Sequence, residues 1–345
     1  MKFSLFLHME RYDDNKTHQE SLAELTELVQ IAEKGGFEMA WVGEHHAMEF
    51  TIAPNPINYI TYLANKTSSI RLGAGTFIAP FWHPVKLAGE AALADIMCDG
   101  RLEFGIARGA YQAEFDRLMN GMPAADGGKY LREMVPALQK LWTSDYAHDG
   151  ELFQFPTTTS VPKPLQQPHP PMWVAARDPD SHNFAISSGC NVMVTPLQKN
   201  DEEVQDLMNK FNDACANNPQ VDRPDIMLLR HTFVGENEQE LTVGTDALHH
   251  WYSMFMAWAR NNQTPDNGFV DRLSSEDLGE GFSKEVLRNN LAVGTPEEVV
   301  ARLKYYETLG VSQYSYWADN SLSFEEKKKS LQLFIDKVMP AFKQD

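Results

Sequence analysis

The sequence has few of the features that mark secreted, membrane or metal-binding proteins. Its 345 residues include three cysteines, whose odd number and irregular spacing argue against a disulfide framework or a zinc motif. No stretch approaches the roughly 20 apolar residues of a membrane-spanning helix. The apolar run at the N-terminus is too short for a signal peptide. We therefore expect a cytoplasmic protein with no metal site and no membrane partner.

Basic residues are also scarce. The chain has 30 lysines and arginines against 48 aspartates and glutamates, which gives a formal net charge of −18. A field of that sign repels nucleic acid and anionic membrane surfaces, so neither is expected as a partner. An anionic cofactor would need a local basic site. An arginine in a glycine-rich turn after a strand is therefore informative in this chain.

Short apolar runs alternate with helical patterns along the chain. The predicted strands cover residues 3–8, 37–42, 70–75, 102–107, 172–176, 191–195, 226–234 and 312–317. The predicted helices cover residues 21–34, 57–64, 85–97, 130–142, 181–188, 202–216, 238–260, 297–309 and 324–342. Repeated β–α units predict a parallel sheet, and eight of them predict a single (β/α)₈ TIM barrel over residues 1–345. An open doubly wound sheet is the alternative, but no G-x-G-x-x-G motif follows the first strand.

Two segments interrupt the alternation. Residues 145–171 are rich in proline and threonine and are predicted to form an insertion between the fourth and fifth strands. Residues 261–290 are polar and precede the last β–α unit. Long polar segments in compact domains are usually functional lids or irregular loops. The second segment is therefore a candidate lid, with a solvated loop as the alternative.

Two adjacent histidines follow the second predicted strand. In a TIM barrel, ligands bind at the C-terminal ends of the strands, which is where Glu44, His45 and His46 lie. Neighbouring side chains of an extended segment point in opposite directions, so at most one imidazole is expected to face the barrel mouth. A neutral imidazole suits general-base chemistry. A pair of hydrogen-bonded structural histidines is the alternative.

Arginines follow the fourth and fifth predicted strands. Arg108 lies between small residues and can reach a phosphate, or it can pair with a carboxylate of a helix. Arg177 precedes a helix that Asp180 or Ser181 would cap, and a helix N-terminus binds phosphate well. Because the two strands are expected to be neighbours, both arginines could converge on one phosphate. At the end of the third predicted strand, Gly75 would let a flat ring system approach the backbone closely, or it would serve a tight turn.

Several short motifs occur together in a fixed order. They are Glu44-His45-His46, His83-Pro84-Val85, the segment 100–109, His250-Trp251-Tyr252, the segment 293–297 and Val338-Met339-Pro340. In this order the chain resembles, nearly end to end, the α subunit of bacterial luciferase and the luciferase-like flavin-dependent monooxygenases. The resemblance implies a TIM barrel that takes reduced FMN from a separate flavin reductase. It also implies that O₂ forms a peroxyflavin, which oxidises a small organic substrate.

The resemblance also implies roles for individual residues. His45 corresponds to the catalytic histidine beside the flavin, and Arg108 to the arginine that binds the phosphate. Gly75-Thr76 corresponds to a cis peptide bond under the flavin ring. The remaining positions of the cofactor site are Ala110, Tyr111, Ala176, Arg177, Asp178 and Ser181. Of these, Arg177, Asp178 and Ser181 belong to the segment that completes the phosphate site, mainly through backbone N–H groups.

Three positions differ from the luciferase α subunit. Ala107 replaces a reactive cysteine, Pro196 a tryptophan and Arg177 an acidic residue, so neither light emission nor a long-chain aldehyde substrate is the expected activity. Six aromatic residues at or near strand ends are candidates for the walls of a dry pocket or are simply barrel core: Phe6, Trp41, Phe77, Phe81, Trp82 and Trp317.

Two alternative functions share the same fold. One is an F420-dependent enzyme of the same superfamily that transfers hydride, and the other is a flavin-binding homologue without turnover. The resemblance also implies a dimer, as a homodimer or a luciferase-type heterodimer. The apolar helix around residues 87–97 is the candidate interface.

Overall fold

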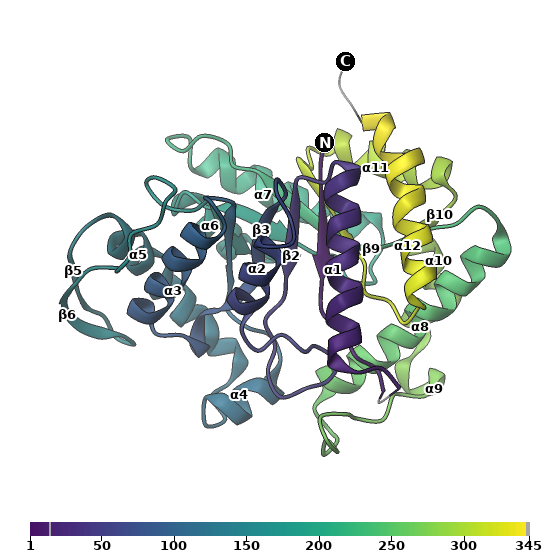
Figure 1. The fold of residues 1–345 in the computed structure, drawn as a ribbon, viewed down its shortest axis with the longest axis horizontal. Coiled ribbons are helices and arrows are strands. Elements are labelled where there is room, and N and C mark those ends of the chain that lie inside the picture. Colours follow the sequence, from purple (N-terminus) through teal and green to yellow (C-terminus); the bar gives the residue numbers. More distant parts are fainter. Residues whose placement is uncertain (14, 343–345) are drawn as a thin grey trace.

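The computed structural model describes residues 1–13 and 15–342 as a closed barrel of eight parallel strands with helices around it (Figure 1). The strands are β1 (Lys2–Leu7), β2 (Met39–Val42), β3 (Arg71–Ile78), β4 (Leu102–Ala107), β7 (Met172–Ala175), β8 (Asn191–Val194), β9 (Ile226–Val234) and β11 (Gln313–Trp317). Each strand pairs with the next in this order, and β11 pairs with β1 to close the barrel. The TIM barrel is confirmed and the open sheet is wrong. The short β10 (Ala292–Gly294) extends the pairing at the end of β9.

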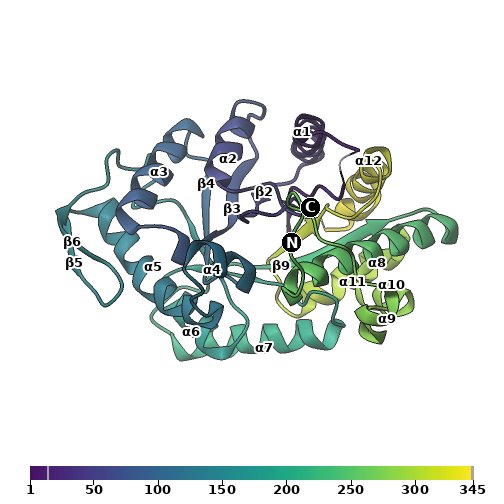
Figure 2. The same ribbon diagram turned by 90° about the horizontal axis from the view of Figure 1, so that it is seen from below.

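The helices form the outer ring of the barrel (Figure 2). They are α1 (His18–Gly35), α2 (Pro56–Ala64), α3 (Pro84–Met97), α5 (Gly127–Thr143), α6 (Pro179–Ser187), α7 (Asp201–Asn217), α8 (Glu238–Arg260), α11 (Pro296–Thr308) and α12 (Phe324–Leu333). Polar N-caps and early prolines start several of them, as in α11, where Thr295 and Glu298 form a capping box. After α12 the chain continues to Phe342 in π and 3₁₀ turns. Outside the two segments that interrupt the alternation, one α-helix of the described residues was not predicted, namely α4 (Gln112–Leu118).

Alternate residues of the strands build two separate layers. On β1, Leu5 and Leu7 belong to the cluster between barrel and helices, whereas Phe6 belongs to the cluster inside the barrel. Trp41, Trp173 and Trp317 share this inner cluster. Period-two alternation places such residues on opposite faces of a strand. The inner cluster therefore fills the barrel beneath the C-terminal strand ends.

The segments that interrupt the β–α alternation both contain regular structure. In the insertion, β5 (Tyr146–Asp149) and β6 (Gln154–Thr158) form an antiparallel hairpin between α5 and β7. The segment 261–290 contains α9 (Ser275–Leu278), a 3₁₀ turn at Glu280–Phe282 and α10 (Lys284–Asn290). Leu278 and Leu287 are buried and anchor it. A plain solvated loop is therefore the wrong description of 261–290, and its role as a lid stays a prediction.

In the part of the chain that the structure describes, no helix combines the length and apolar character that crossing a membrane requires.

Candidate active site at the barrel mouth

A histidine and a glutamate meet at the mouth beyond β2. Nδ1 of His45 lies 3.3 Å from each carboxylate oxygen of Glu114, and the His45 side chain is only 11% exposed. Glu114 belongs to α4 and also accepts the backbone N–H of His46 at 2.7 Å. A carboxylate at Nδ1 favours the tautomer with the proton on that nitrogen and fixes the orientation of the ring. Nε2 is then the nitrogen that can accept a proton.

His46 has a different set of partners. Its Nε2 lies 2.8 Å from Glu44, whose carboxylate also accepts the backbone N–H of Ile78 and the indole N–H of Trp82. The two neighbouring imidazoles thus contact separate groups, as the alternation of an extended segment predicts. His46 belongs to a structural network at the edge of the barrel.

One predicted residue, Tyr111, and one that was not predicted, His8, pack against His45. The rings of Tyr111 and His8 contact its imidazole edge-on, with centroids 4.9 Å and 4.7 Å away. The Gly75–Thr76 peptide bond is cis, as the resemblance implies. A Cβ at Gly75 would lie 3.0 Å from the Phe6 ring, so the backbone here approaches the inner cluster closely.

The two predicted phosphate arginines have unequal surroundings. Arg108 is exposed after β4 and donates to the carbonyl of Ala124 at 3.1 Å, and no carboxylate within residues 1–13 and 15–342 forms an ion pair with it. Arg177 is also exposed, but its guanidinium lies 3.2 Å from Glu203 of α7. β4 and β7 are neighbours, yet the guanidinium groups have separate partners. Pairing with a helix carboxylate thus describes Arg177 and not Arg108.

The turn before α6 is organised by Asp178 and Ser181. Asp178 is the N-cap and accepts the backbone N–H of Ser181 at 2.9 Å. The Ser181 hydroxyl accepts the N–H groups of Arg177 and Asp178. The prediction that Asp180 or Ser181 caps this helix is therefore wrong. Pro179 at the first helical position starts the helix earlier, since its fixed φ suits that position. Ala176 precedes this turn and is buried.

A buried acidic cluster lies on the other side of the mouth. Glu10 accepts hydrogen bonds from Nδ1 of His8 at 3.0 Å and from the Tyr12 hydroxyl and the Trp251 indole. Asp319, after β11, accepts the backbone N–H of His8. Across the described residues, neither carboxylate forms an ion pair with a lysine or arginine. Both are therefore buried without a compensating cation in contact.

Burial shifts the ionisation of these groups. Loss of hydration raises the pKa of Glu10 to about 8 and the pKa of Asp319 to about 6. It lowers the pKa of His8 to about 3, with the nearby His45 acting in the same direction. His8 is consequently neutral near pH 7 and does not neutralise Glu10.

Aromatic rings enclose this acidic side. The His231 ring is stacked on the Trp317 ring, with centroids 3.9 Å apart. The Trp251 ring meets the same imidazole edge-on, with centroids 4.3 Å apart. Of the six candidate wall residues, Phe6, Trp41 and Trp317 belong to the inner cluster. Phe77 belongs to the outer cluster, Trp82 packs against it, and Phe81 contacts His46 and Phe115.

Sequence reasoning missed His8, Glu10, Glu114 and Asp319. His8 follows β1 directly, so the rule that singled out His45 could have found it. Glu114 lies in a segment that carried no helix assignment. Glu10 and Asp319 lie in loops, and the sequence around them gives no signal that they are buried.

The residues on the β3–β4–β7 side fit a flavin. Gly75, Ala107 and Ala175 at these strand ends are small and partly or fully exposed, which leaves backbone accessible to a flat ring. Arg108 offers donors to a phosphate, whereas the backbone N–H groups of Arg177, Asp178 and Ser181 at the start of α6 already bond to Ser181 and Asp178. This donor set, small and locally basic within an acidic chain, suits an anionic cofactor.

Comparisons with known proteins identify the family. The family model for luciferase-like monooxygenases matches residues 1–313. The oxygenase component of flavin-dependent trigonelline monooxygenase from Acinetobacter baylyi is 52% identical over all of this chain and 96% of its own. The alkanal monooxygenase alpha chain of the Kryptophanaron alfredi symbiont is 25% identical over 100% of this chain and 99% of its own.

Solved structures extend the comparison. The monooxygenase RslO1 from Streptomyces bottropensis matches with a TM-score of 0.85 and 25% identity, over 99% of this chain and all of that one. An F420-dependent secondary alcohol dehydrogenase matches with a TM-score of 0.77 but 16% identity over 99% of both chains, which shows a shared fold alone. The chain belongs to the luciferase-like monooxygenase family and is a flavin-dependent monooxygenase.

Proposed function

We propose that this chain is the cytoplasmic oxygenase component of a two-component system that oxygenates a cationic N-heteroaromatic carboxylate of the trigonelline type. A separate flavin reductase would supply reduced FMN, which provides the electrons to place one atom of O₂ in the substrate and release the other as water. The observation that carries this proposal is the 52% identity to the trigonelline enzyme over the full length of this chain.

The acidic side of the mouth supports a cationic substrate. Trigonelline is an N-methylated pyridinium ring with a carboxylate. Among the described residues, no lysine or arginine contacts the buried carboxyl groups of Glu10 and Asp319, and a positive ring beside them would favour their ionised forms. Trp251 and Trp317 lie beside this cluster with ring centroids 5.0 Å apart, and indole rings attract cations.

The other residues divide the remaining tasks. His45 would take a proton at Nε2, with Glu114 as the residue that positions it. Arg108 would hold the flavin phosphate together with the turn Ala176–Ser181, which includes Arg177 and Asp178. Gly75, Thr76, Ala110 and Tyr111 would line the flavin ring. The buried aromatic cluster would exclude water from the reaction.

The test supplies purified protein with a flavin reductase, FMN, NADH, ¹⁸O₂ and trigonelline. We expect a product that carries one ¹⁸O atom, detected by mass spectrometry. Absence of that product would refute the substrate class, and absence of tight reduced-FMN binding in an anaerobic titration would refute the cofactor. Stable, oxygen-independent reduction of F420 by candidate substrates would favour the hydride-transfer alternative instead.

We also propose a homodimer formed through α2 and α3, which lie side by side (Figure 2). Leu93 and Met97 on α3 are 49% and 51% exposed, and Tyr62 on α2 is 48% exposed. Exposed apolar groups of this size on one face are typical of subunit interfaces. Light scattering of the wild-type protein should give the mass of two chains. The double variant Leu93→Glu with Met97→Glu should give the mass of one chain. A monomeric wild-type protein would contradict the proposal.

A further inference from the structure

A polar cavity lies outside the barrel mouth, between α8 and the segment 272–284. We call it the α8 pocket. Its volume is about 310 Å³, at the lower end for small-molecule sites. α8, α9 and α10 lie together at one edge of the molecule (Figure 1). The lining residues that matter for its chemistry are His249 and His250 of α8, Arg272, Ser275 and Lys284.

The α8 pocket gathers donors that lack acceptors. Within residues 1–13 and 15–342, the side chains of His249, His250 and Arg272 form no hydrogen bond or ion pair. Lys284 forms an ion pair with Asp246 at 2.8 Å. The lining thus contains two permanent cations and one carboxylate, in a chain whose net charge is −18. This local excess of positive charge is the reverse of the overall balance.

Burial and the nearby positive charges lower the pKa values of both histidines. Burial and then the nearby Lys284 and Arg272 lower the pKa of His249. Burial and then Arg272 lower the pKa of His250. Asp246 near His249 and Asp13 near His250 act in the opposite direction without cancelling the effect. A bound anion would remove the repulsion and accept hydrogen bonds from the same side chains.

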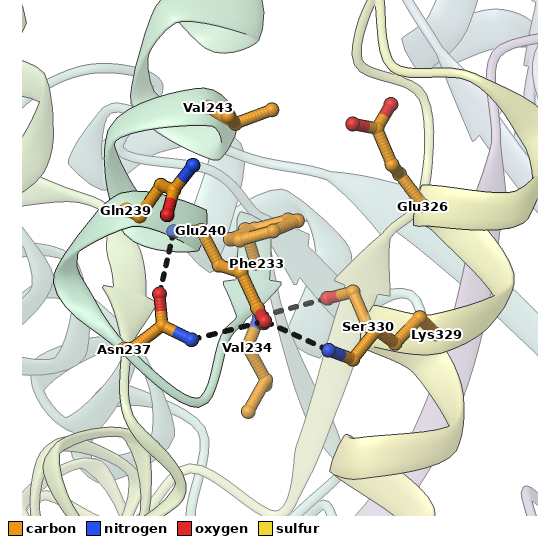
Figure 3. Close-up of a pocket in the computed structure, with 9 residues that line it drawn as sticks. All are labelled: Phe233, Val234, Asn237, Gln239, Glu240, Val243, Glu326, Lys329 and Ser330. Atoms are coloured by element: carbon orange, nitrogen blue, oxygen red, sulfur yellow. Dashed lines mark hydrogen bonds and ion pairs between the residues drawn. The ribbon is translucent and has the colours of Figure 1, made fainter.

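A second cavity of about 320 Å³ shows the contrast (Figure 3). It lies between α8 and α12. There the Glu240 carboxylate accepts hydrogen bonds from Lys329 at 2.8 Å and from the Asn237 amide at 3.1 Å. Lys329 also pairs with Glu236. Its charged groups are already satisfied by one another, so this cavity has no unmet need for a ligand.

We propose that the α8 pocket binds the oxyanion group, carboxylate or phosphate, of a small ligand. The Tyr12 side chain lies between the pocket and the acidic side of the mouth. The His250 ring lies 5.9 Å from the Tyr12 ring, measured between centroids, and the Tyr12 hydroxyl donates a hydrogen bond to Glu10. An oxyanion site here counters the repulsion that an anionic ligand meets from the rest of the chain. A ligand carboxylate and a ligand phosphate, other than the flavin phosphate assigned to Arg108, are the two sources of this chemistry.

Histidine NMR tests the proposal on the full chain. Protein labelled with ¹⁵N-histidine is titrated with inorganic phosphate in one arm and with sodium acetate in the other, at constant ionic strength. His249→Gln and His250→Gln assign the two imidazoles. We expect saturable shifts of both imidazoles and a rise of both pKa values. Saturation by phosphate points to a phosphorylated ligand, and saturation by acetate to a ligand with a carboxylate.

Matched variants locate the bound anion. Arg272→Gln should weaken anion binding about tenfold or more, as the loss of a charge-assisted hydrogen bond does. Arg223→Gln removes the same charge from an exposed arginine that bonds to Asn212 elsewhere, and it should leave binding unchanged. No saturable shift with either anion, or equal affinity in wild type and Arg272→Gln, would overturn the proposal. Because turnover is not measured, this result would leave the proposed oxygenase function untouched.

Discussion

The two halves of the barrel mouth are built from opposite kinds of residue. The basic half, at the ends of β3, β4 and β7, has the small residues Gly75, Ala107 and Ala175 and the exposed arginines Arg108 and Arg177. The acidic half, at the ends of β1, β9 and β11, has buried histidines, tryptophans and carboxylates, listed as His8, Glu10, His231, Trp251, Trp317 and Asp319. One half is open and offers hydrogen-bond donors. The other is closed and lacks a cation.

The histidine at the end of β2 lies between these halves. β2 pairs with β1 on one side and β3 on the other. The His45 ring accordingly contacts His8 of the acidic half and Tyr111, which follows β4. A group at this junction can reach both a flavin in one half and a substrate in the other. The division therefore predicts that cofactor binding, substrate binding and proton transfer depend on separate residues, which substitutions can test one by one.

The largest effect is expected at the junction. His45→Asn should lower kcat about 10²–10⁴-fold, the usual contribution of a general acid–base group. Reduced FMN and substrate should still bind, because neither half is altered. Turnover with a flavin reductase and anaerobic binding titrations measure the two quantities. His46→Asn is the matched control, with a much smaller expected effect on kcat. Wild-type turnover in His45→Asn would remove this residue from the chemistry.

Glu10→Gln should weaken substrate binding by the acidic half and leave flavin binding by the basic half unchanged. Loss of a buried carboxylate that faces a cationic ring should raise the substrate Kd about 10- to 100-fold, or ~1.4–2.7 kcal/mol. The Kd for reduced FMN should hardly change. Calorimetry under anaerobic conditions gives both constants, with thermal unfolding to confirm that the variant folds. A parallel loss of flavin binding would show that the halves are not independent.

The pH dependence of stability should also report on Glu10. Because burial raises its pKa from 4.5 to about 8, the folded state holds an extra proton between those pH values. The contribution of Glu10 to stability is then lost as pH rises through this window, with a slope of up to about 1.4 kcal/mol per pH unit. In urea titrations, the unfolding free energy of the wild type minus that of Glu10→Gln should fall from pH 5 to pH 8. A constant gap would mean that Glu10 is ionised throughout.

In the basic half, Arg108→Gln should weaken reduced-FMN binding about tenfold or more, since hydrogen bonds to charged groups contribute about 1.5–3 kcal/mol. The substrate Kd, measured separately, should stay close to that of the wild type. Equal flavin affinity of the variant and the wild type would place the phosphate elsewhere.

The basic half was predictable from sequence because its residues belong to local motifs. Each predicted cofactor residue lies near the C-terminal end of a strand whose apolar run is visible, and parallel strands bring these ends together. The acidic half depends on contacts between distant positions. The bond between Trp251 and Glu10 joins residues 241 positions apart, and that between His8 and Asp319 joins residues 311 apart. Periodicity shows which face of an element is buried and does not show which loops meet.

The helix that positions His45 was missed for a local reason. α4 has seven residues, and its N-cap Tyr111 makes no capping hydrogen bond with its side chain. A helix this short and without a polar cap has neither the length nor the start signal on which a sequence prediction rests. Its stability comes instead from tertiary contacts such as the buried Phe115. Glu114 therefore became visible as a partner of His45 only in the folded structure.

The smallest effect is expected for the second arginine of the basic half. Arg177 is already paired with Glu203 at the surface, and such exposed pairs contribute only ~0–1 kcal/mol. Arg177→Gln should therefore raise the Kd for reduced FMN less than about threefold, against the larger loss for Arg108→Gln. The double variant decides between two arrangements. If the losses simply add, the arginines act separately, and Arg108 alone holds the phosphate. If Arg177→Gln matches Arg108→Gln and the double variant is hardly worse than either, both guanidinium groups close on one phosphate, and Arg177 leaves Glu203 when the cofactor binds.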